Sequence, residues 1–314
     1  SKILVTGASG FIGERLCKEL LSRGRAVLGV TRNQRSVIEG VEYVGLPSVA
    51  EISSLPFHAS DCVIHLAGRA HVQDKGAQAL SRFREINSDL AVRVASAALA
   101  SGVRRFIFVS SIGVNGGSTS LSAIDESSLP APHADYALSK LEAELALQKL
   151  IQDSHMELVI VRPPLVYAGN APGNFARLLK VVQSGVPLPF ASVVNQRSMI
   201  ALENIVDFLV LCIDHPKAAG ELFLVSDGDD VSISEIIKTI AFGMGVPARL
   251  FRFPPSCMHS IARLARREAL YNQLCASLVI DSRKSRELLG WVPVVTVRDA
   301  LAKAGLDYRQ LISS

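Results

Sequence analysis

Short runs of apolar, β-branched residues alternate with longer stretches of helical periodicity through the first half of the chain. The runs are apolar throughout, which is typical of central parallel strands covered by helices on both faces. The predicted strands are 3–6, 26–31, 61–66, 105–110 and 158–162, and the predicted helices are 13–23, 83–101 and 136–152. This repetition predicts an α/β fold with a doubly wound parallel sheet.

Turn-forming residues become more frequent after the segment 162–164, where short helical and extended pieces mix. We therefore predict a smaller C-terminal lobe that binds the substrate. The helical and then strand-like pattern over 202–225 could return to the sheet edge, which would make this lobe discontinuous. The predicted division is a dinucleotide-binding Rossmann domain over 1–165, to which 200–225 returns, and a lobe formed by 166–199 and 226–314. The Ser-, Gly- and Pro-rich stretch 113–135 is long for a loop, and long loops are often functional.

Composition narrows the class of protein. The chain has 314 residues, 49% of them hydrophobic, and a formal net charge of +4, which excludes intrinsic disorder. Aromatic residues make up only 6%, so a surface that stacks single-stranded nucleic acid is not indicated. No apolar run reaches the roughly 18 residues of a membrane span. The strand predicted near the N-terminus leaves no room for a secretory signal.

Cysteine and histidine positions bear on metal binding and on the compartment. The five cysteines form an odd set without CxxC spacing, and the seven histidines show no metal-ligand spacing. We therefore expect no metal site, and reduced thiols in a cytoplasmic protein whose partner is a small molecule.

Three glycines at a three-residue spacing follow the first predicted strand and begin the first predicted helix. Gly7 permits a tight turn, Gly10 lets the backbone approach a pyrophosphate, and Gly13 lets the helix pack closely on the strand. The free N–H groups at the start of the helix would bind the phosphates. The pattern predicts a dinucleotide site.

The second predicted strand leads into Arg32, where an NAD-preferring fold places an acidic residue on the ribose 2′-hydroxyl. The Arg32 guanidinium, with Arg35 following, could instead bind a 2′-phosphate through charge-assisted hydrogen bonds. We therefore expect NADP as the cofactor, with NAD as the alternative. The other interpretation of Arg32 is a solvated charge at the end of a strand.

A tyrosine and a lysine stand four residues apart at the start of a predicted helix, which places Tyr136 and Lys140 on one face. An adjacent ammonium group should lower the tyrosine pKa from its usual value of about 10. Ser110 and Ser111 end the strand at 105–110, on the edge of the sheet where ligands bind in this architecture.

Several motifs together resemble the extended short-chain dehydrogenase/reductase family, in its nucleotide-sugar epimerase, dehydratase and reductase branch. The motifs are TGASGFIG at 6–13, DCVIHLAG at 61–68, VSS at 109–111 and YALSK at 136–140, and the segments 162–167, 197–204 and 281–293 agree with them. The resemblance covers nearly the whole chain and is more specific for the family than for the reaction.

The resemblance implies a role for each matching residue. Tyr136 would be the acid/base, Lys140 would orient the nicotinamide ribose and tune Tyr136, and Ser111 would hydrogen-bond the reacting sugar oxygen. Asn87 would have a structural or water-holding role. Arg197 would bind the substrate pyrophosphate, and Asn174 would contact the uridine diphosphate. The implied cofactor-binding residues are Gly7, Gly10, Phe11, Ile12, Gly13, Arg32, Leu66, Ala67, Gly68, Tyr136, Lys140 and Pro163.

Two departures from the family pattern stand out. Leu46 occupies the position after the third strand where the family usually has an aspartate that binds adenine. A second arginine for the substrate pyrophosphate has no clear match, and its candidates are Arg263, Arg266 and Arg267, for which a solvated basic helix face is an equal alternative.

The favoured function at this stage is an NADP-dependent reductase of a UDP-4-keto-6-deoxy-hexosamine in surface polysaccharide synthesis. Arg32 favours it, because a 2′-phosphate suits an enzyme that draws on a reducing pool. The alternative is a UDP-sugar 4-epimerase, of the UDP-glucose or UDP-N-acetylglucosamine type, with bound NAD. A non-catalytic nucleotide-sensing module is a remoter alternative.

We also expect a homodimer, because closed two-fold dimers are common among soluble enzymes. The apolar faces of 83–100 and 136–151 could form a four-helix interface with a second copy, through Leu90, Val94, Leu141 and Leu145.

Overall fold

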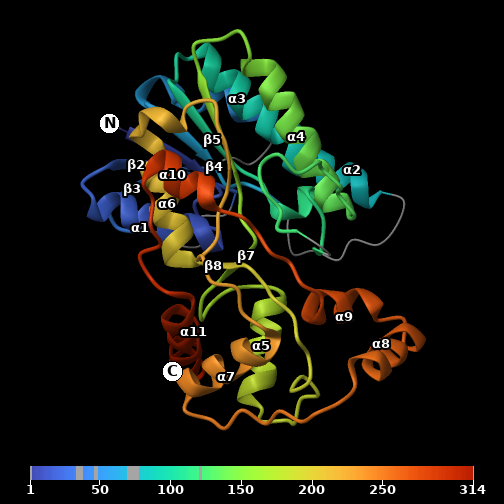
Figure 1. Ribbon diagram of the computed structural model, residues 1–314. Helices are drawn as coiled ribbons and strands as arrows, with labels where there is room; N and C mark the ends of the chain where they lie inside the picture. The colour runs from blue at the N-terminus through green and yellow to red at the C-terminus, as the bar shows by residue number, and fades with distance from the viewer. Residues whose placement is uncertain (1, 33–37, 46–48, 69–77, 120–121, 314) are drawn as a thin grey trace.

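A parallel sheet forms the centre of the computed structural model, which describes residues 2–32, 38–45, 49–68, 78–119 and 122–313 (Figure 1). Its seven strands follow the order β3-β2-β1-β4-β5-β6-β9. The strands are β1 (Lys2–Thr6), β2 (Ala26–Thr31), β3 (Val41–Gly45), β4 (Cys62–His65), β5 (Arg105–Val109), β6 (Glu157–Arg162) and β9 (Leu222–Leu224). The order reverses direction between β1 and β4, which confirms the doubly wound fold.

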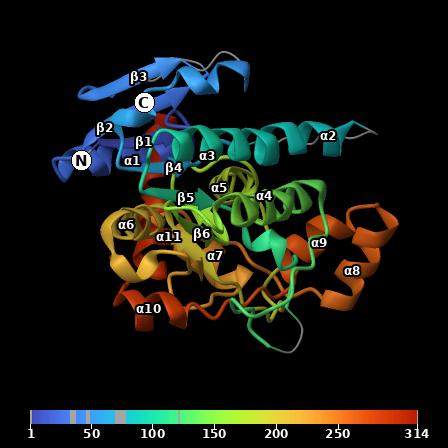
Figure 2. The same ribbon diagram turned by 90° about the horizontal axis from the view of Figure 1, so that it is seen from above.

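Helices cover both faces of this sheet. On one face, α1 (Phe11–Ser22) and α6 (Leu202–Asp214) pack into a core with residues such as Leu16 and Phe208. On the other face lie α3 (Leu90–Ala100) and α4 (Asp135–Ile151), which run side by side in Figure 2. The strands between these layers are apolar because both of their faces are buried.

The hydrophobic pattern did not predict the edge strand β3, although the resemblance places a strand directly before position 46. None of its residues is fully buried, and Glu42 and Gly45 are exposed, so β3 lacks the continuous apolar run that marks the central strands. The predicted helix at 83–101 is also interrupted. It comprises α2 (Ala79–Phe83), a π-helical turn η3 (Arg84–Asp89) and α3. Such π turns often occur at functional sites.

A smaller group of elements follows β6 and has its own hydrophobic core, which includes Phe175, Ile237 and Leu301. Its elements are β7 (Leu165–Tyr167), β8 (Met199–Ala201), α5 (Asn174–Gln183), α7 (Ile233–Met244) and α11 (Val297–Ser313). The remaining helices are α8 (Pro255–Leu264), α9 (Glu268–Cys275) and α10 (Arg283–Leu289). The chain returns to the main sheet between these pieces, because β9 pairs with β6. The domain boundaries stay a prediction.

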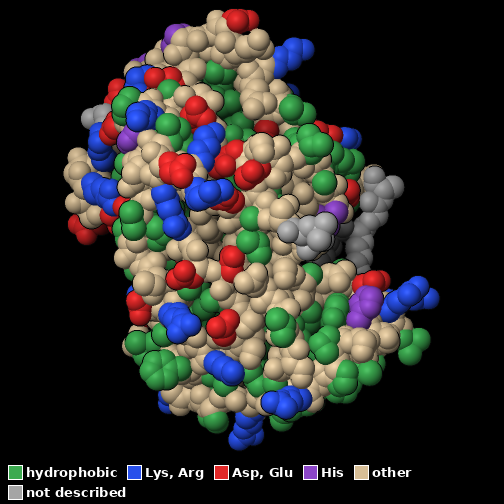
Figure 3. All heavy atoms as spheres, viewed as in Figure 1, with side chains coloured by type: hydrophobic (Ala, Val, Ile, Leu, Met, Phe, Trp, Pro, Cys, Tyr) green, Lys and Arg blue, Asp and Glu red, His purple; other side chains and the backbone are tan. Residues whose placement is uncertain are grey.

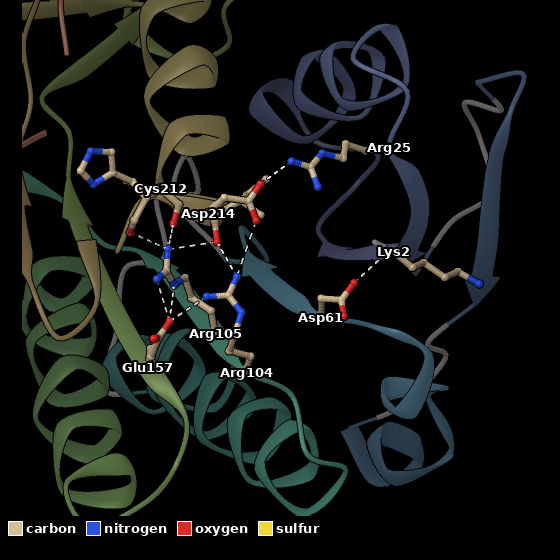
Figure 4. A network of polar contacts seen from close by, with 10 residues as sticks. Lys2, Arg25, Asp61, Arg104, Arg105, Glu157, Cys212 and Asp214 are labelled. Atoms are coloured by element: carbon tan, nitrogen blue, oxygen red, sulfur yellow. Dashed lines mark hydrogen bonds and ion pairs between the residues drawn. The ribbon is translucent and has the colours of Figure 1, made fainter. Parts of the chain in front are cut away.

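A buried arginine ties the returning helix α6 to the sheet (Figure 4). Arg105 of β5 is 1% exposed and donates hydrogen bonds to the carbonyl oxygens of Cys212, Ile213 and His215 at the end of α6. Its Nε also donates to Glu157 at 2.7 Å. The last carbonyls of a helix lack intrahelical partners and carry partial negative charge, so a cation satisfies them.

Candidate active site

A cleft of about 1400 Å³ lies at the carboxyl ends of the central strands. Gly7 follows β1, Leu66 follows β4, Ser110 follows β5 and Pro163 follows β6, and all four residues line the cleft. The opposite wall includes α9. Ligands of doubly wound sheets bind at this edge, where the strand order reverses.

The glycine loop is packed as the spacing predicts. Gly7 has a φ of +71°, and a Cβ there would lie 2.8 Å from the nitrogen of Ala67. A Cβ at Gly13 would collide with the carbonyl oxygen of Gly7. Gly10 is the N-terminal residue that precedes α1, and no side chain caps the helix. The N–H groups of Gly7, Ala8 and Gly10 donate to backbone carbonyl oxygens of Val30 and Gly7. The uncapped start of α1 is therefore the part of the loop that a dinucleotide pyrophosphate could use.

Most of the implied cofactor residues line this cleft. They are Gly7, Gly10, Phe11, Ile12, Gly13, Arg32, Leu66, Gly68, Tyr136, Lys140 and Pro163. Ala67 does not line it, and its N–H donates to the Thr6 hydroxyl at 3.3 Å. Arg32 is exposed at the cleft edge, while Arg35 and Leu46 lie outside the described residues.

The three implied catalytic residues come together on the wall of the cleft beside β5 and α4. Ser111 follows β5, accepts a hydrogen bond from the Gly113 N–H at 3.1 Å, and hydrogen-bonds the phenol of Tyr136. Lys140 lies one turn after Tyr136 on α4 and is 3% exposed. Ser110 is buried and its hydroxyl has no partner among the described residues.

Burial, and not the neighbouring lysine, has the largest effect on the pKa of Tyr136. Desolvation raises the pKa of Tyr136 to about 12, while the hydrogen bond from Ser111 lowers it. The expectation that Lys140 lowers this pKa is therefore wrong for the ligand-free chain. Lys140 Nζ instead donates to the carbonyl oxygen of Val109 at 3.0 Å and lies 4.7 Å from the ring centre of Phe108.

Burial also makes the ammonium group of Lys140 easier to deprotonate. Burial lowers the pKa of its ammonium group to about 8, and Glu144, one turn further along α4, raises it. Glu144 is 2% exposed and forms a two-point ion pair with Arg162, whose Nε lies 2.9 Å from Glu144 Oε1. Lys140, Glu144 and Arg162 therefore form a group of buried charged side chains behind the cleft wall that carries Tyr136.

Asn87 is fully buried in the π-helical turn η3 and faces the same turn of α4. Its Nδ2 donates to the Ser139 hydroxyl at 3.0 Å. A Cβ on Gly68 would lie 3.2 Å from Asn87 Oδ1 and 3.4 Å from Lys140 Nζ. Asn87 therefore lies near Lys140 behind Gly68, which lines the cleft, and its amide is buried.

The two implied substrate residues differ in position. Arg197 lines the cleft, and one of its guanidinium nitrogens donates to the carbonyl oxygen of Ala276 at 2.8 Å. Burial lowers the pKa of Arg197. Asn174 begins α5 outside the cleft, where its side chain accepts from Arg177 at 3.3 Å. The structure therefore does not bring Asn174 to the site.

Other lining residues escaped the sequence analysis. α9 contributes Ala269, Asn272 and Gln273, and the loop after β5 contributes the segment 115–118 and His133. In the sequence, only the length and composition of the 113–135 loop pointed to the lining residues that come from that loop. No local pattern marks the α9 residues. The candidates Arg263, Arg266 and Arg267 are exposed and do not line the cleft.

Within the described ranges, no helix is both long and apolar enough to cross a membrane. Among the same residues, no group of three histidine, cysteine or acidic side chains is placed to hold a metal ion.

Comparisons with known proteins agree on one family. Residues 3–226 match the model of the NAD-dependent epimerase/dehydratase family. The chain is 39% identical over 313 residues to a UDP-glucose 4-epimerase of Vibrio cholerae, covering 98% of this chain and 95% of that protein. It is 25% identical to an N-acetyl-α-D-glucosaminyl-diphospho-ditrans,octacis-undecaprenol 4-epimerase of Escherichia coli O157:H7, over 76% and 71% of the two chains. The crystal structure of UDP-glucuronic acid 4-epimerase from Bacillus cereus in complex with NAD has a similar fold, with a TM-score of 0.80, 22% identity and full coverage of both chains.

Proposed function

This chain belongs to the NAD-dependent epimerase/dehydratase family, and on that premise we propose that it is a 4-epimerase of a UDP-linked sugar that works with bound NAD. The observation that carries the proposal is the placement of Ser111, Tyr136 and Lys140 in one cleft with the glycine loop. The near full-length similarity to a UDP-glucose 4-epimerase supports the epimerase over the reductase that the sequence analysis favoured.

The cleft fits a dinucleotide. A side chain at Gly7 or Gly13 would clash with backbone, so the loop is shaped for close approach of a phosphate. Gly7, Gly10 and Gly13 would hold the pyrophosphate, and Lys140 would bind the nicotinamide ribose. Bound NAD would supply a reversible hydride acceptor for C4 of the sugar.

The residues of this chain handle the proton and the oxygen. Tyr136 takes the proton of the sugar 4-hydroxyl through its phenolate and gives it back in the reverse direction. Ser111 donates to the same sugar oxygen and holds it in reach of the phenol. A positive charge brought close to Tyr136 by the ligand would oppose the burial that raises its pKa. Acid/base catalysis of this kind contributes about 10² to 10⁴ in rate.

The test follows an isotope at C4. A UDP-hexose deuterated at C4 is incubated with the purified protein and no added cofactor, and the 4-epimer is identified by NMR. We expect equilibrium between the two epimers with the deuterium retained. Tyr136→Phe should lose about 10² to 10⁴ in rate and keep its affinity for NAD, because only the transferable proton is removed. Absence of epimer from UDP-glucose, UDP-N-acetylglucosamine and UDP-glucuronic acid alike would exclude the proposal.

A reductase is the second candidate, and Arg32 at the cleft edge is the observation that favours it. Here a UDP-4-keto-6-deoxy-hexosamine would receive hydride from NADPH while Tyr136 protonates the ketone oxygen. Deuterium from labelled NADPH would then appear at C4 of the product, and no epimer would form without added NADPH.

Cofactor choice separates the two candidates further. If Arg32 binds a 2′-phosphate, Arg32→Asp should shift the NADPH to NADH preference at least about tenfold, because charge-assisted hydrogen bonds contribute roughly 1.5 to 3 kcal/mol. Competition binding of the two cofactors measures the ratio. An unchanged ratio identifies Arg32 as a surface charge and removes the main support for the reductase.

A further inference from the structure

The helices α8 and α9 differ from the other helices of the second lobe in how little they bury. Neither contains a buried residue, although α8 has 10 residues and α9 has 8. The equally long α5 buries Phe175, Leu179 and Val182. Figure 1 shows α8 and α9 projecting from the body of the molecule at the lower right.

The outer face of α8 is apolar. Cys257, Ile261 and Leu264 are spaced four and three residues apart, so they share one face of the helix. Ile261 is 57% exposed and Leu264 is 88% exposed. Met258 packs against the core of the second lobe. The apolar face formed by Cys257, Ile261 and Leu264 is therefore separate from the side of the helix that contacts the lobe. Leu270 of α9 is also 42% exposed.

The segment that carries this apolar face is basic. Between residues 236 and 280 the chain has six lysines and arginines and a single acidic residue, Glu268. Glu268 lies 3.0 Å from His259 in an ion-pair geometry. Arg263, Arg266 and Arg267 lie exposed at the bend between the two helices. Figure 3 shows hydrophobic and basic side chains together at this projecting tip.

The same helix pair borders the cleft. Ala269, Asn272 and Gln273 of α9 line it, across from Tyr136 and Ser111. α8 contacts α9, so a partner on the outer face of α8 would bind the helix pair that forms part of the cleft wall.

We propose that the outer face of α8 and α9 docks on an anionic phospholipid surface. An exposed apolar stripe flanked by arginines is the composition of helices that lie in a membrane interface, where aliphatic side chains enter between the acyl chains and arginines meet the phosphates. A second copy of the chain fits poorly, because a two-fold contact would set the three arginines against their own copies. A nucleic acid fits poorly because the most exposed groups at the tip are aliphatic and not aromatic. Docking would hold the cleft mouth at the lipid headgroups.

The experiment is co-sedimentation of the full chain with vesicles of phosphatidylcholine containing one-third phosphatidylglycerol. We expect binding to these vesicles at low salt, little binding to pure phosphatidylcholine, and weakening as salt is raised. Leu264→Ser should weaken partitioning about tenfold, and Arg263→Ser or Arg267→Ser about fivefold each. The matched controls are Val292→Ser, just after α10, where Val292 is 71% exposed, and Arg283→Ser, at the start of α10, where the side chain is also exposed. Both should bind like the wild type.

Turnover of a soluble nucleotide sugar and the sedimentation coefficient are measured on the same variants. Unchanged turnover and an unchanged oligomeric state support docking that is separate from catalysis. The proposal is overturned if the wild type does not bind anionic vesicles, or if Leu264→Ser binds as the wild type does. Loss of self-association in Leu264→Ser, without lipid binding by the wild type, would identify a protein interface instead. These readouts do not depend on which reaction the cleft catalyses.

Discussion

At the scale of single residues, the most unusual group in the site is the ammonium of Lys140. It is 3% exposed, its Nζ donates to the Val109 carbonyl oxygen at 3.0 Å, and the carboxylate of Glu144 lies one turn further along α4. A charge in such surroundings costs free energy unless it is fully compensated. This ammonium group lies where the nicotinamide ribose is expected to bind. Its free-energy cost is consistent with a residue that serves function and lowers stability.

Lys140→Met should therefore change how stability depends on pH. Burial lowers the pKa of Lys140 to about 8, whereas its unperturbed value is 10.5. Between these two pH values the unfolded chain holds a proton that the folded chain has released, so this residue makes the wild type more stable as pH rises. From pH 7 to pH 10, the wild type should gain about 2 to 3 kcal/mol of unfolding free energy relative to Lys140→Met.

Urea unfolding of both proteins at the two pH values measures this gain. Lys149→Met is the matched control, because Lys149 is an exposed lysine on the same helix. The control should show no such difference. An equal response of Lys140→Met and Lys149→Met would mean that the buried ammonium is not destabilised.

At the scale of elements, a buried ion pair joins α4 to β6 and to the loop that follows β5. Arg162 of β6 is 4% exposed and pairs with Glu144 of α4. A second guanidinium nitrogen of Arg162 donates to Asn115 Oδ1 at 2.9 Å, and Asn115 Nδ2 donates to the Ser128 carbonyl oxygen at 2.9 Å. The pair thus anchors the helix that carries Tyr136 and the loop that lines the cleft.

Glu144→Gln should destabilise the chain by about 3 to 5 kcal/mol, because it leaves the buried Arg162 charge without a counter-ion. Glu142→Gln is a matched control on the same helix. Glu142 pairs with Arg84 at 2.7 Å, but both side chains are partly exposed, so the loss should stay below about 1 kcal/mol. Chemical denaturation of both variants gives the two values. Similar losses for the two variants would contradict the role assigned to the buried pair.

At the scale of the whole molecule, the oligomeric state of the chain stays a prediction. Leu90 and Val94, expected to join a helical interface, are buried against the sheet within the chain and are therefore not available to a second copy. Leu145 of α4 is 57% exposed, and Leu141, one turn before it, is partly exposed. The predicted interface therefore loses Leu90 and Val94 and is centred on α4.

Leu145→Glu should convert a dimer into a monomer, because it places a charge in the centre of an apolar contact. Leu306→Glu on α11 is the control, since Leu306 is 48% exposed on another side of the second lobe. Sedimentation velocity at micromolar concentration distinguishes the two species. A wild type that sediments as a monomer would remove the dimer altogether.

Much of the fold and part of the site were predictable because their signals are local. The strand, the glycine turn through Gly13 and the following helix are contiguous, and the four-residue step from Tyr136 to Lys140 fixes a shared helix face. The buried strands are apolar runs that identify themselves without knowledge of their neighbours. Local spacing therefore determined the sheet, the phosphate loop and the catalytic face of α4.

The tertiary structure decided what depends on segments far apart in the sequence. α9 joins the cleft wall although it lies more than a hundred residues after Tyr136, and Asn174 stays outside although its motif resembles a substrate contact. The sign of the Tyr136 pKa shift was also decided there, since it depends on how many atoms exclude water from the phenol and not on the nearest charged residue in the sequence. Burial and long-range contact arise from the sum of all packed segments, so no local pattern of residues encodes them.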